Sequence, residues 1–331
     1  MFEKLQGQKR LLLENELKPV QGERFQPTGF PDLGAATYQT ADGKRKLLVE
    51  STQSVANRLE STILGPNNEL MPELVGLSYI QVQLTMGSDT TTNSLIEAHR
   101  INSPFIISDN DFKRKFLKDS EYGANKPINW QKIARALFKY DVNSLLHGVF
   151  LANLEDGRVK VARALSGFIE ATDVQEVVSG GVKNNPIDPT GTLRAKDFDK
   201  DVYGNVPYQR VEYTARDIRA FFNLDLGLLK SYAPGGDGYL NHDAYELLVA
   251  LALFKIRAFL EGGTRLRTAC DLTPAGELME KDGYTVPSKD ELLSFLKTKI
   301  QACKGMFAVP AITPIITETV IKAKRKPGED E

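Results

Sequence analysis

The chain has 331 residues, of which 41% are hydrophobic, 8% are aromatic and 26% are charged. This composition is typical of a globular protein with a sizeable core and excludes wholesale disorder. Lysine and arginine total 42 against 43 aspartates and glutamates, for a net charge of -1. This balance excludes a polycation that holds nucleic acid by bulk charge, but it leaves room for a local basic groove.

The cysteine count and the hydropathy pattern favour a cytoplasmic protein. Cys270 and Cys303 are too few for a disulfide framework or a four-cysteine zinc site, and a reducing compartment is the natural interpretation. Residues 1–10 are charged and lack the apolar segment of a signal peptide. The longest apolar run, Leu247–Phe254, is far short of the ~20 residues that a membrane-spanning helix needs.

The first half of the chain predicts strands at its start and helices later. Leucines alternate with charged residues over Leu11–Leu17, the period of a half-buried strand. A loop rich in glycine and proline follows at 22–34. Apolar residues spaced by four over Val55–Ile63 predict one face of a helix. Residues 77–86 predict a second strand, and residues 88–147 are expected to be mainly helical.

The middle of the chain predicts hairpins. Asp156-Gly157 is a turn sequence between expected strands at 148–154 and 159–169. Residues 179–210 lack a strong period and are rich in glycine, proline and asparagine, so we expect a long projecting loop or a loose hairpin. The pattern at Thr214–Asp217 predicts a capping box that opens a short helix.

The last third predicts two helices and a strand. His242–Glu261 is apolar around most of its circumference and is followed by two glycines, which indicates a buried helix. Ser288–Glu291 is a capping box that opens another helix, and residues 309–321 are expected to form a strand. The mixed order of helices and strands predicts an α+β fold with a largely antiparallel sheet.

Common enzyme signatures are missing from the sequence. It has no GxxxxGK[ST], GxSxG or HExxH motif, and its three histidines are scattered. The stretch Asp237–Asp243 resembles a calcium loop only faintly, because Ala233 and Ala244 fall where ligands are needed. We interpret it as a glycine-rich turn before a helix. We expect no catalytic residue, no metal and no cofactor.

The first candidate binding cluster is Arg24, Phe25 and Gln26 in the glycine-rich loop. A cation beside an aromatic ring can hold a phosphate and stack a base. The alternative is a loop that packs on the core through Phe25 and Phe30.

Two further clusters come from the predicted helical segments. Gln53, Asn57 and Arg58 could meet phosphates from a helix edge, or they could form a solvated helix face. His99 and Arg100 could do likewise, or could be structural.

The glycine-rich segments of the second half hold the remaining candidates. Lys183, Asn184 and Asn185 follow two glycines, which allow the backbone to approach a ligand closely. Arg265 and Arg267 lie on one side of a predicted strand and could track phosphates. A flexible loop and ordinary surface arginines are the alternatives.

Seven segments, taken together and in order, resemble a known family. They are ERFQPTGFPDLG (23–34), VESTQSVANRLE (49–60), IEAHRINSPFI (96–106), LLHGVFLA (145–152), ARALSGFIEA (162–171), GGVKNNPIDPTG (180–191) and GGTRLRTACDL (262–272). The sequence resembles the backbone subunit of type I-G (formerly I-U) CRISPR Cascade effectors, the Cas-seven group of the RAMP superfamily. The resemblance covers nearly the whole chain.

The resemblance implies one RRM-like (ferredoxin-like) domain over 1–331, with a helical insertion at 88–147 and a thumb at 175–212. Copies of such a subunit stack along one CRISPR RNA and hold its spacer for pairing with target DNA. The implied partners are CRISPR RNA, the target DNA strand, other copies, the large subunit and the repeat-processing subunit, and DNA cleavage belongs to a separate helicase-nuclease. The RNA-binding residues then expected are Arg24, Phe25, Gln26, Gln53, Asn57, Arg58, His99, Arg100, Lys183, Asn184, Asn185, Arg194, Arg265 and Arg267.

A near-neutral chain can bind RNA if its cations gather. Our hypothesis is that one groove is faced by Arg24, Arg58, Arg100, Lys183, Arg265 and Arg267. The enzyme alternative is a metal-dependent ribonuclease that uses the loop residue Asp32 on paired target RNA, as related type III backbones do. A protein that assembles without RNA is a second alternative. A small-molecule enzyme has no supporting constellation.

Overall fold

The computed structural model describes residues 1–30, 32–85, 89–193, 204–280 and 284–318. Its centre is an antiparallel sheet of eight strands in the order β14-β15-β1-β13-β10-β5-β4, with β16 also paired to β1. The strands are β1 (Leu11–Pro19), β4 (Thr37–Gln39), β5 (Arg45–Glu50), β10 (Leu165–Thr172), β13 (Asp217–Leu224), β14 (Thr264–Arg267), β15 (Cys270–Pro274) and β16 (Met279–Glu280). An α+β fold with a largely antiparallel sheet is confirmed.

Strand β1 shows why the sheet has a buried face. Leu11, Leu13 and Leu17 are buried while the residues between them are exposed or half-buried. The same alternation occurs in β13, which pairs with β1 from Leu11 opposite Leu224 to Leu17 opposite Ile218. Alternating side chains point to opposite sides of a strand, so paired strands with matching patterns share one core face.

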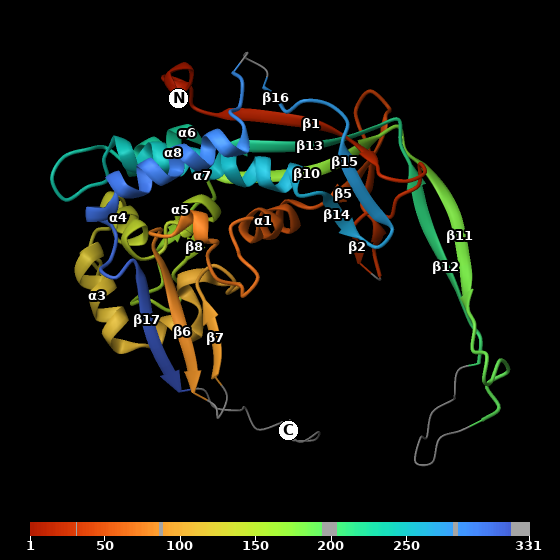
Figure 1. Cartoon of the computed structure of the whole chain (residues 1–331), viewed down its shortest axis with the longest axis horizontal. Coiled ribbons are helices and arrows are strands. Elements are labelled where there is room, and N and C mark those ends of the chain that lie inside the picture. The colour runs from red at the N-terminus through yellow and green to blue at the C-terminus, as the bar shows by residue number, and fades with distance from the viewer. Residues whose placement is uncertain (31, 86–88, 194–203, 281–283, 319–331) are drawn as a thin grey trace.

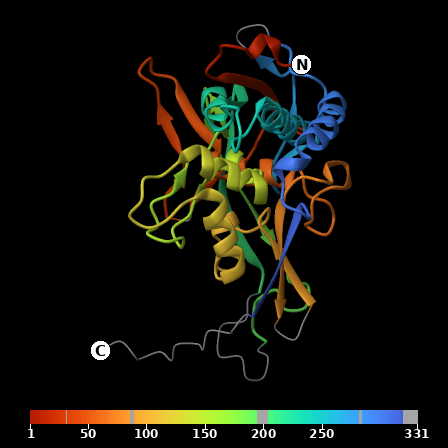
Figure 2. The same ribbon diagram turned by 90° about the vertical axis from the view of Figure 1, so that its left-hand side faces the viewer.

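Helices cover the buried face of this sheet (Figures 1 and 2). The helices on this side are α1 (Thr52–Ser61), α6 (Leu226–Tyr232), α7 (His242–Glu261) and α8 (Lys289–Ala302). Phe259 of α7 meets Phe222 of β13 edge to face at 6.2 Å. A Cβ on Gly167 would lie 2.8 Å from the Phe221 carbonyl oxygen and 3.1 Å from Val55 of α1. Gly167 therefore allows α1 to approach the sheet.

A helical region lies beside the sheet and ends in a smaller sheet. Its helices are α2 (Pro104–Ile107), α3 (Asn110–Ser120), α4 (Trp130–Tyr140) and α5 (Asn143–His147). The smaller sheet has the order β17-β6-β7, formed by Ile312–Glu318, Tyr79–Thr85 and Asp89–Asn93. We call it the three-stranded arm. Short pairs are β2 (Gly29–Phe30) with β3 (Gly34–Ala35), and β8 (Val149–Phe150) with β9 (Lys160–Val161).

A long hairpin leaves the main sheet between β10 and β13. Its strands are β11 (Gln175–Lys183) and β12 (Val206–Thr214), paired antiparallel along their whole length. We call it the hairpin arm. It projects to the same side of the main sheet as the three-stranded arm, and α1 lies between the two arms (Figure 1).

Several sequence predictions are confirmed and several are wrong. The buried helix His242–Glu261 and the capping box at Ser288 form as expected. Residues 89–93 form strand β7 and not a helix, because they pair with β6. Thr214–Asp217 opens no helix: Thr214 ends β12 and Asp217 begins β13. The same local pattern serves a tight turn there, in which the Arg216 amide donates to the Thr172 carbonyl at 3.1 Å.

The hairpin expected around Asp156-Gly157 is much shorter than predicted. Only β8 and β9 pair across it, while β10 pairs with β13 and β5. Over the residues that the structure describes, none of the helices is both long and apolar enough to span a membrane.

Candidate nucleic-acid interface

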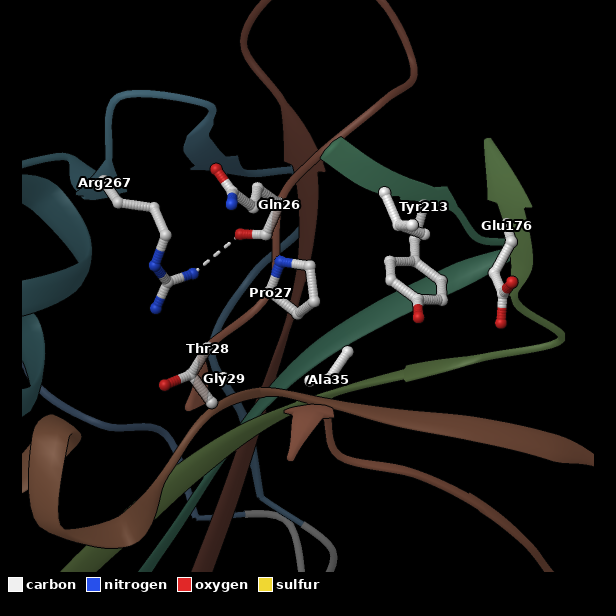
Figure 3. Close-up of a pocket in the computed structure, with 10 residues that line it drawn as sticks. Gln26, Pro27, Thr28, Gly29, Ala35, Glu176, Tyr213 and Arg267 are labelled. Carbon is white, nitrogen blue, oxygen red and sulfur yellow. Dashed lines mark hydrogen bonds between the residues drawn. The ribbon is translucent and has the colours of Figure 1, made fainter. Parts of the chain in front are cut away.

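A polar cavity of about 600 Å³ lies where the glycine-rich loop meets the base of the hairpin arm (Figure 3). Its lining comes from Gln26, Pro27, Thr28, Gly29, Gly34, Ala35, Glu176, Val211, Tyr213 and Arg267. Arg267 and Tyr213 lie on opposite sides of Pro27 in Figure 3. Burial and then the charge of Glu176 raise the pKa of Tyr213, so this side chain is a neutral hydrogen-bonding group at the cavity.

Arg267 joins the cavity to the core of the main sheet. Its Nη1 donates to the Gln26 carbonyl at 2.8 Å and to the Val49 carbonyl at 3.3 Å. Its Nη2 pairs with the carboxylate of Glu50, which is fully buried at the end of β5. The Arg267 side chain remains 24% exposed. These contacts fix the plane of the guanidinium at the cavity wall.

Glu50 also binds the helix that follows it. Arg58 of α1 donates from Nε to Glu50 at 2.8 Å, and the Ser54 hydroxyl donates to the same carboxylate at 2.5 Å. Arg58 further donates to the Arg265 carbonyl at 3.4 Å and to the Leu266 carbonyl at 2.6 Å. We call Glu50, Arg58, Arg265 and Arg267 the arginine site.

Arg265 is the most available cation of the arginine site. Its side chain is exposed on β14, at one edge of the main sheet. Within the described part of the chain, no side chain pairs with it. On the neighbouring face of α1, the exposed Gln53 donates to Asn57 at 2.9 Å and accepts from Arg163 at 2.8 Å. Cations and amides therefore lie along one edge of α1.

Arg24 lies at the base of the hairpin arm. It is 57% exposed and pairs with the buried Glu212 at 3.1 Å. Glu212 also accepts from the Ser179 hydroxyl at 2.7 Å and pairs with Arg210 at 3.4 Å. Two arginines share one carboxylate here, as they do at Glu50. A second cavity of about 450 Å³, lined by residues that include Arg24 and Glu212, opens beside this pair.

Arg100 belongs to a different environment. It donates to both carboxylate oxygens of Glu60, at 2.6 and 2.8 Å, and to the Gly148 carbonyl at 3.0 Å. Its side chain is 12% exposed. This pair adjoins a set of buried polar residues, and we call the whole the buried polar cluster. Its members are Glu60, Arg100, Asp141, Asn143, His147 and Lys255.

Burial dominates the protonation of this cluster. It lowers the pKa of Lys255 to about 7 and the pKa of His147 well below its usual value, and it raises the pKa of Asp141 to about 6. Lys255 bonds the side chain of Asn143 and lies 3.0 Å from Nε2 of His147. These contacts join α7 to α5, so the cluster fastens the helical region to the sheet.

The remaining predicted residues lie apart. Lys183 and Asn184 are exposed at the far end of β11, and His99 is exposed beside the buried polar cluster. Asn185 shapes a turn, since its side-chain oxygen accepts from the Ile187 and Asp188 amides at 3.1 Å each. Arg194 lies outside the described residues.

The structure thus groups only some of the predicted residues. Arg58, Arg265 and Arg267 meet in the arginine site, and Gln26 contacts Arg267. Lys183 lies at the far end of the hairpin arm and Arg100 in the buried polar cluster, so the single groove expected for all six cations is wrong.

The prediction of a base-stacking role for Phe25 is corrected by its position. Its side chain is 1% exposed within the core, with its backbone bridged to Tyr213. A ring with both faces covered by apolar neighbours has none left for a base. The alternative interpretation, a loop that packs on the core, holds for this residue.

Sequence reasoning missed the acidic partners and one aromatic residue. Glu50, Glu60 and Glu212 were not singled out, although each binds one or more of the predicted arginines. A glutamate at the end of an apolar strand, as in Leu47-Leu48-Val49-Glu50, was the available signal for a buried carboxylate. Tyr213 offered no comparable signal.

Asp32 is exposed on the turn between β2 and β3, whose glycines line the cavity. Among the described residues, no three His, Cys, Asp or Glu side chains are grouped so that they could hold a metal ion.

Comparison with known proteins gave one family and two solved structures. The family model described as CRISPR-associated protein GSU0053 (Cas_GSU0053) matches residues 11–176, about half of the chain. A chain of a "CRISPR RNA-guided surveillance complex, pre-nicking" is similar at 14% identity and a TM-score of 0.41, over 80% of this chain and 74% of that one. Csc2 of Thermofilum pendens is similar at 8% identity and a TM-score of 0.31, over 92% and 79%. No curated protein matches the chain.

Proposed function

The chain belongs to the family of CRISPR-associated protein GSU0053, and from this membership we propose that it is the CRISPR RNA-binding backbone subunit of a Cascade surveillance complex. The family match carries the proposal, because it covers the segment that holds Arg24, Glu50 and α1. The type I-G subtype is part of the proposal and is supported by the seven sequence segments quoted above.

The chemistry of the arginine site suits this role. In RNA-guided complexes the protein grips the guide backbone while base pairing reads the sequence. Such a protein needs fixed cations and amides more than groups that recognise base edges. Arg265, Arg58 and Arg267 supply the cations, and Gln53 and Asn57 supply amides on the adjacent edge of α1. Local cations of this kind are compatible with a net charge of -1.

We propose further that the core is RRM-like. The order β1-α1-β10-β13-α7-β15 is the β-α-β-β-α-β order of ferredoxin-like folds, with β15, β1, β13 and β10 adjacent in the sheet. The hairpin arm would then be the thumb at 175–212. The segment at 88–147 would be the helical insertion, beginning with β7.

Assembly and partners complete the proposal. Copies would stack along one CRISPR RNA by a head-to-tail contact that does not close, which generates a helix. The spacer would be presented to a target DNA strand in the cytoplasm, beside a large subunit and a repeat-processing subunit. We expect no catalytic step in this chain, since cleavage would belong to a separate nuclease.

Co-purification of RNA tests the proposal. The full chain is co-expressed with its CRISPR array and partner subunits, and the RNA that accompanies it is sequenced. Spacer-containing RNA in a large particle that high salt dissociates is the expected result. A particle without nucleic acid, with the partners present, would overturn the RNA-binding role and favour a protein that assembles alone.

Arg265 allows a finer version of this test. Arg265→Ala should weaken RNA binding and make the slope of log K against log salt shallower by about 0.7, the value for one phosphate contact on a single strand. Arg114→Ala is the matched control, because Arg114 is 78% exposed on α3, outside the arginine site. Equal losses for both variants would argue against a contact at Arg265.

The ribonuclease alternative has a definite test at Asp32, which lies on a turn that borders the cavity. Purified complex is incubated with labelled RNA complementary to the guide, with and without Mg²⁺. Cleavage that requires Mg²⁺ and is lost in Asp32→Asn would replace the scaffold proposal with the enzyme. Intact RNA under both conditions is the expected result.

A further inference from the structure

We propose that Glu50 is the positioning residue of the RNA-backbone site, holding Arg58 and Arg267 together so that one phosphodiester can bind both. The inference rests on the proposed function and deepens it. Glu50 itself is fully buried and touches no ligand. It would act only through the two guanidinium groups.

The contacts of Glu50 converge from three separate segments. Its carboxylate lies at the end of β5 and accepts from Ser54 and Arg58 of α1 and from Arg267 of β14. Arg267 is 217 residues away in sequence. Bonds to ionised groups are roughly twice as strong as neutral ones, so this carboxylate defines where both arginines lie.

Charge balance explains why the pair would attract a phosphate. Two guanidinium groups close together repel each other, and one carboxylate neutralises only one of them. The three groups therefore carry a net charge of about +1. Glu50 is inaccessible, whereas the side chains of Arg58 and Arg267 are 30% and 24% exposed. The excess positive charge is thus presented at the surface, where a phosphodiester carries one negative charge.

Donor geometry points the same way. A guanidinium has five N–H donors in a fixed plane. Arg58 uses one from Nε for Glu50 and one from each Nη for the carbonyls of Leu266 and Arg265, which leaves two. Arg267 is held at the wall of the 600 Å³ cavity, and the exposed Arg265 lies next to both. The oriented donors are therefore ready before RNA arrives.

The neighbouring pair of Glu60 and Arg100 provides a matched control. It also joins a buried glutamate to an arginine across the fold, with bonds of 2.6 and 2.8 Å. However, only one arginine binds Glu60, and this arginine is 12% exposed. Glu60→Gln and Glu50→Gln are therefore similar changes to buried ion pairs, and only the second disturbs the surface cations.

The experiment compares wild type, Glu50→Gln and Glu60→Gln as full chains. Binding of a labelled single-stranded RNA is measured by fluorescence anisotropy over a range of salt concentrations, and stability is measured by urea unfolding. We expect Glu50→Gln to weaken RNA binding at least tenfold, with a slope shallower by about 0.7. We expect Glu60→Gln to change binding less than twofold.

The sign of the effect is decisive. Glu50→Gln removes a negative charge, so simple charge counting predicts tighter RNA binding, whereas loss of positioning predicts weaker binding. Unchanged or tighter binding would overturn the inference while leaving the proposed function intact. If wild type binds no RNA even with its partners, the proposed function itself fails.

A second variant covers the case in which Glu50→Gln does not fold. Arg58→Lys keeps the charge but replaces the planar group with a single ammonium. We expect it to weaken RNA binding severalfold with an unchanged net charge. Wild-type affinity in Arg58→Lys would show that the fixed guanidinium plane is not needed, and would also overturn the inference.

Discussion

Two buried glutamates lie at opposite ends of helix α1, and their arginines face different surroundings. Glu50 precedes the helix and binds two arginines that remain partly exposed, while Glu60 near its end binds one arginine that is almost covered. The first carboxylate leaves a positive charge at the surface, and the second is matched by one arginine inside the fold. Similar ion pairs can therefore serve ligand binding in one place and attachment of a helical region in another.

The largest expected effect is the loss of Arg100. Arg100→Ala leaves Glu60 buried without its cation, which costs about 3–5 kcal/mol of unfolding free energy. Arg58→Ala should cost less, because Arg267 still balances Glu50. Urea unfolding of both variants measures the difference. Equal losses would mean that the two glutamates are equivalent, contrary to our comparison.

Lys255 should make the stability of the buried polar cluster depend on pH. Its pKa is about 7 in the folded chain and near 10.5 when unfolded, so the unfolded chain binds more protons between these values. The unfolding free energy should therefore rise with pH from about 7 to 10.5, by up to about 1.4 kcal/mol per unit. The other groups facing Lys255, namely Glu60, Asp141, Asn143, His147 and Arg100, do not titrate in that window.

Replacement of this lysine isolates its contribution. Lys255→Met should flatten the rise in stability between pH 7 and 10.5, as measured by urea unfolding at several pH values. Arg58→Ala, on the Glu50 side, should keep the wild-type rise. An identical pH profile in Lys255→Met and wild type would show that Lys255 is not the group responsible.

The smallest expected effect concerns the start of α1. Ser51 caps the helix by accepting from the Ser54 amide at 3.2 Å, beside Glu50 and a full helix length from Glu60. Ser51→Ala should cost about 1 kcal/mol. Hydrogen exchange of the first-turn amides should accelerate while the amides of α5 keep their protection. Faster exchange in α5 as well would indicate that the two ends of α1 are coupled.

Local sequence patterns predicted the elements that depend on local physics. The alternation in β1, the apolar circumference of α7 and the capping box at Ser288 each reflect forces within one segment, and each is confirmed. The Thr214–Asp217 pattern failed because it fits both a helix start and a turn. The pairing of β10 with β13, which lie on either side of the hairpin arm, decides between them.

The candidate site was harder to predict because its contacts are distant in sequence. Arg58 and Arg267 were singled out as cations, but their shared partner Glu50 depends on how β5, α1 and β14 come together. Arg100 looked equally suitable in sequence, and only its burial beside Glu60 separates it from the others. A sequence identifies charged residues, whereas the fold determines which of these charges are already neutralised.

The place at which the hairpin arm leaves the sheet has a consequence for its length. The arm leaves β10 after Thr172 and returns at Asp217, and these two residues are paired with each other. Its ends are thus anchored by the core ladder, and Asp173 and Arg216 join them by an ion pair at 3.1 Å. Adding or removing one residue from each strand would move the tip by about 3.4 Å without altering a core pairing. The arm is in effect a ruler whose length can change by insertion or deletion while the body that carries it stays the same.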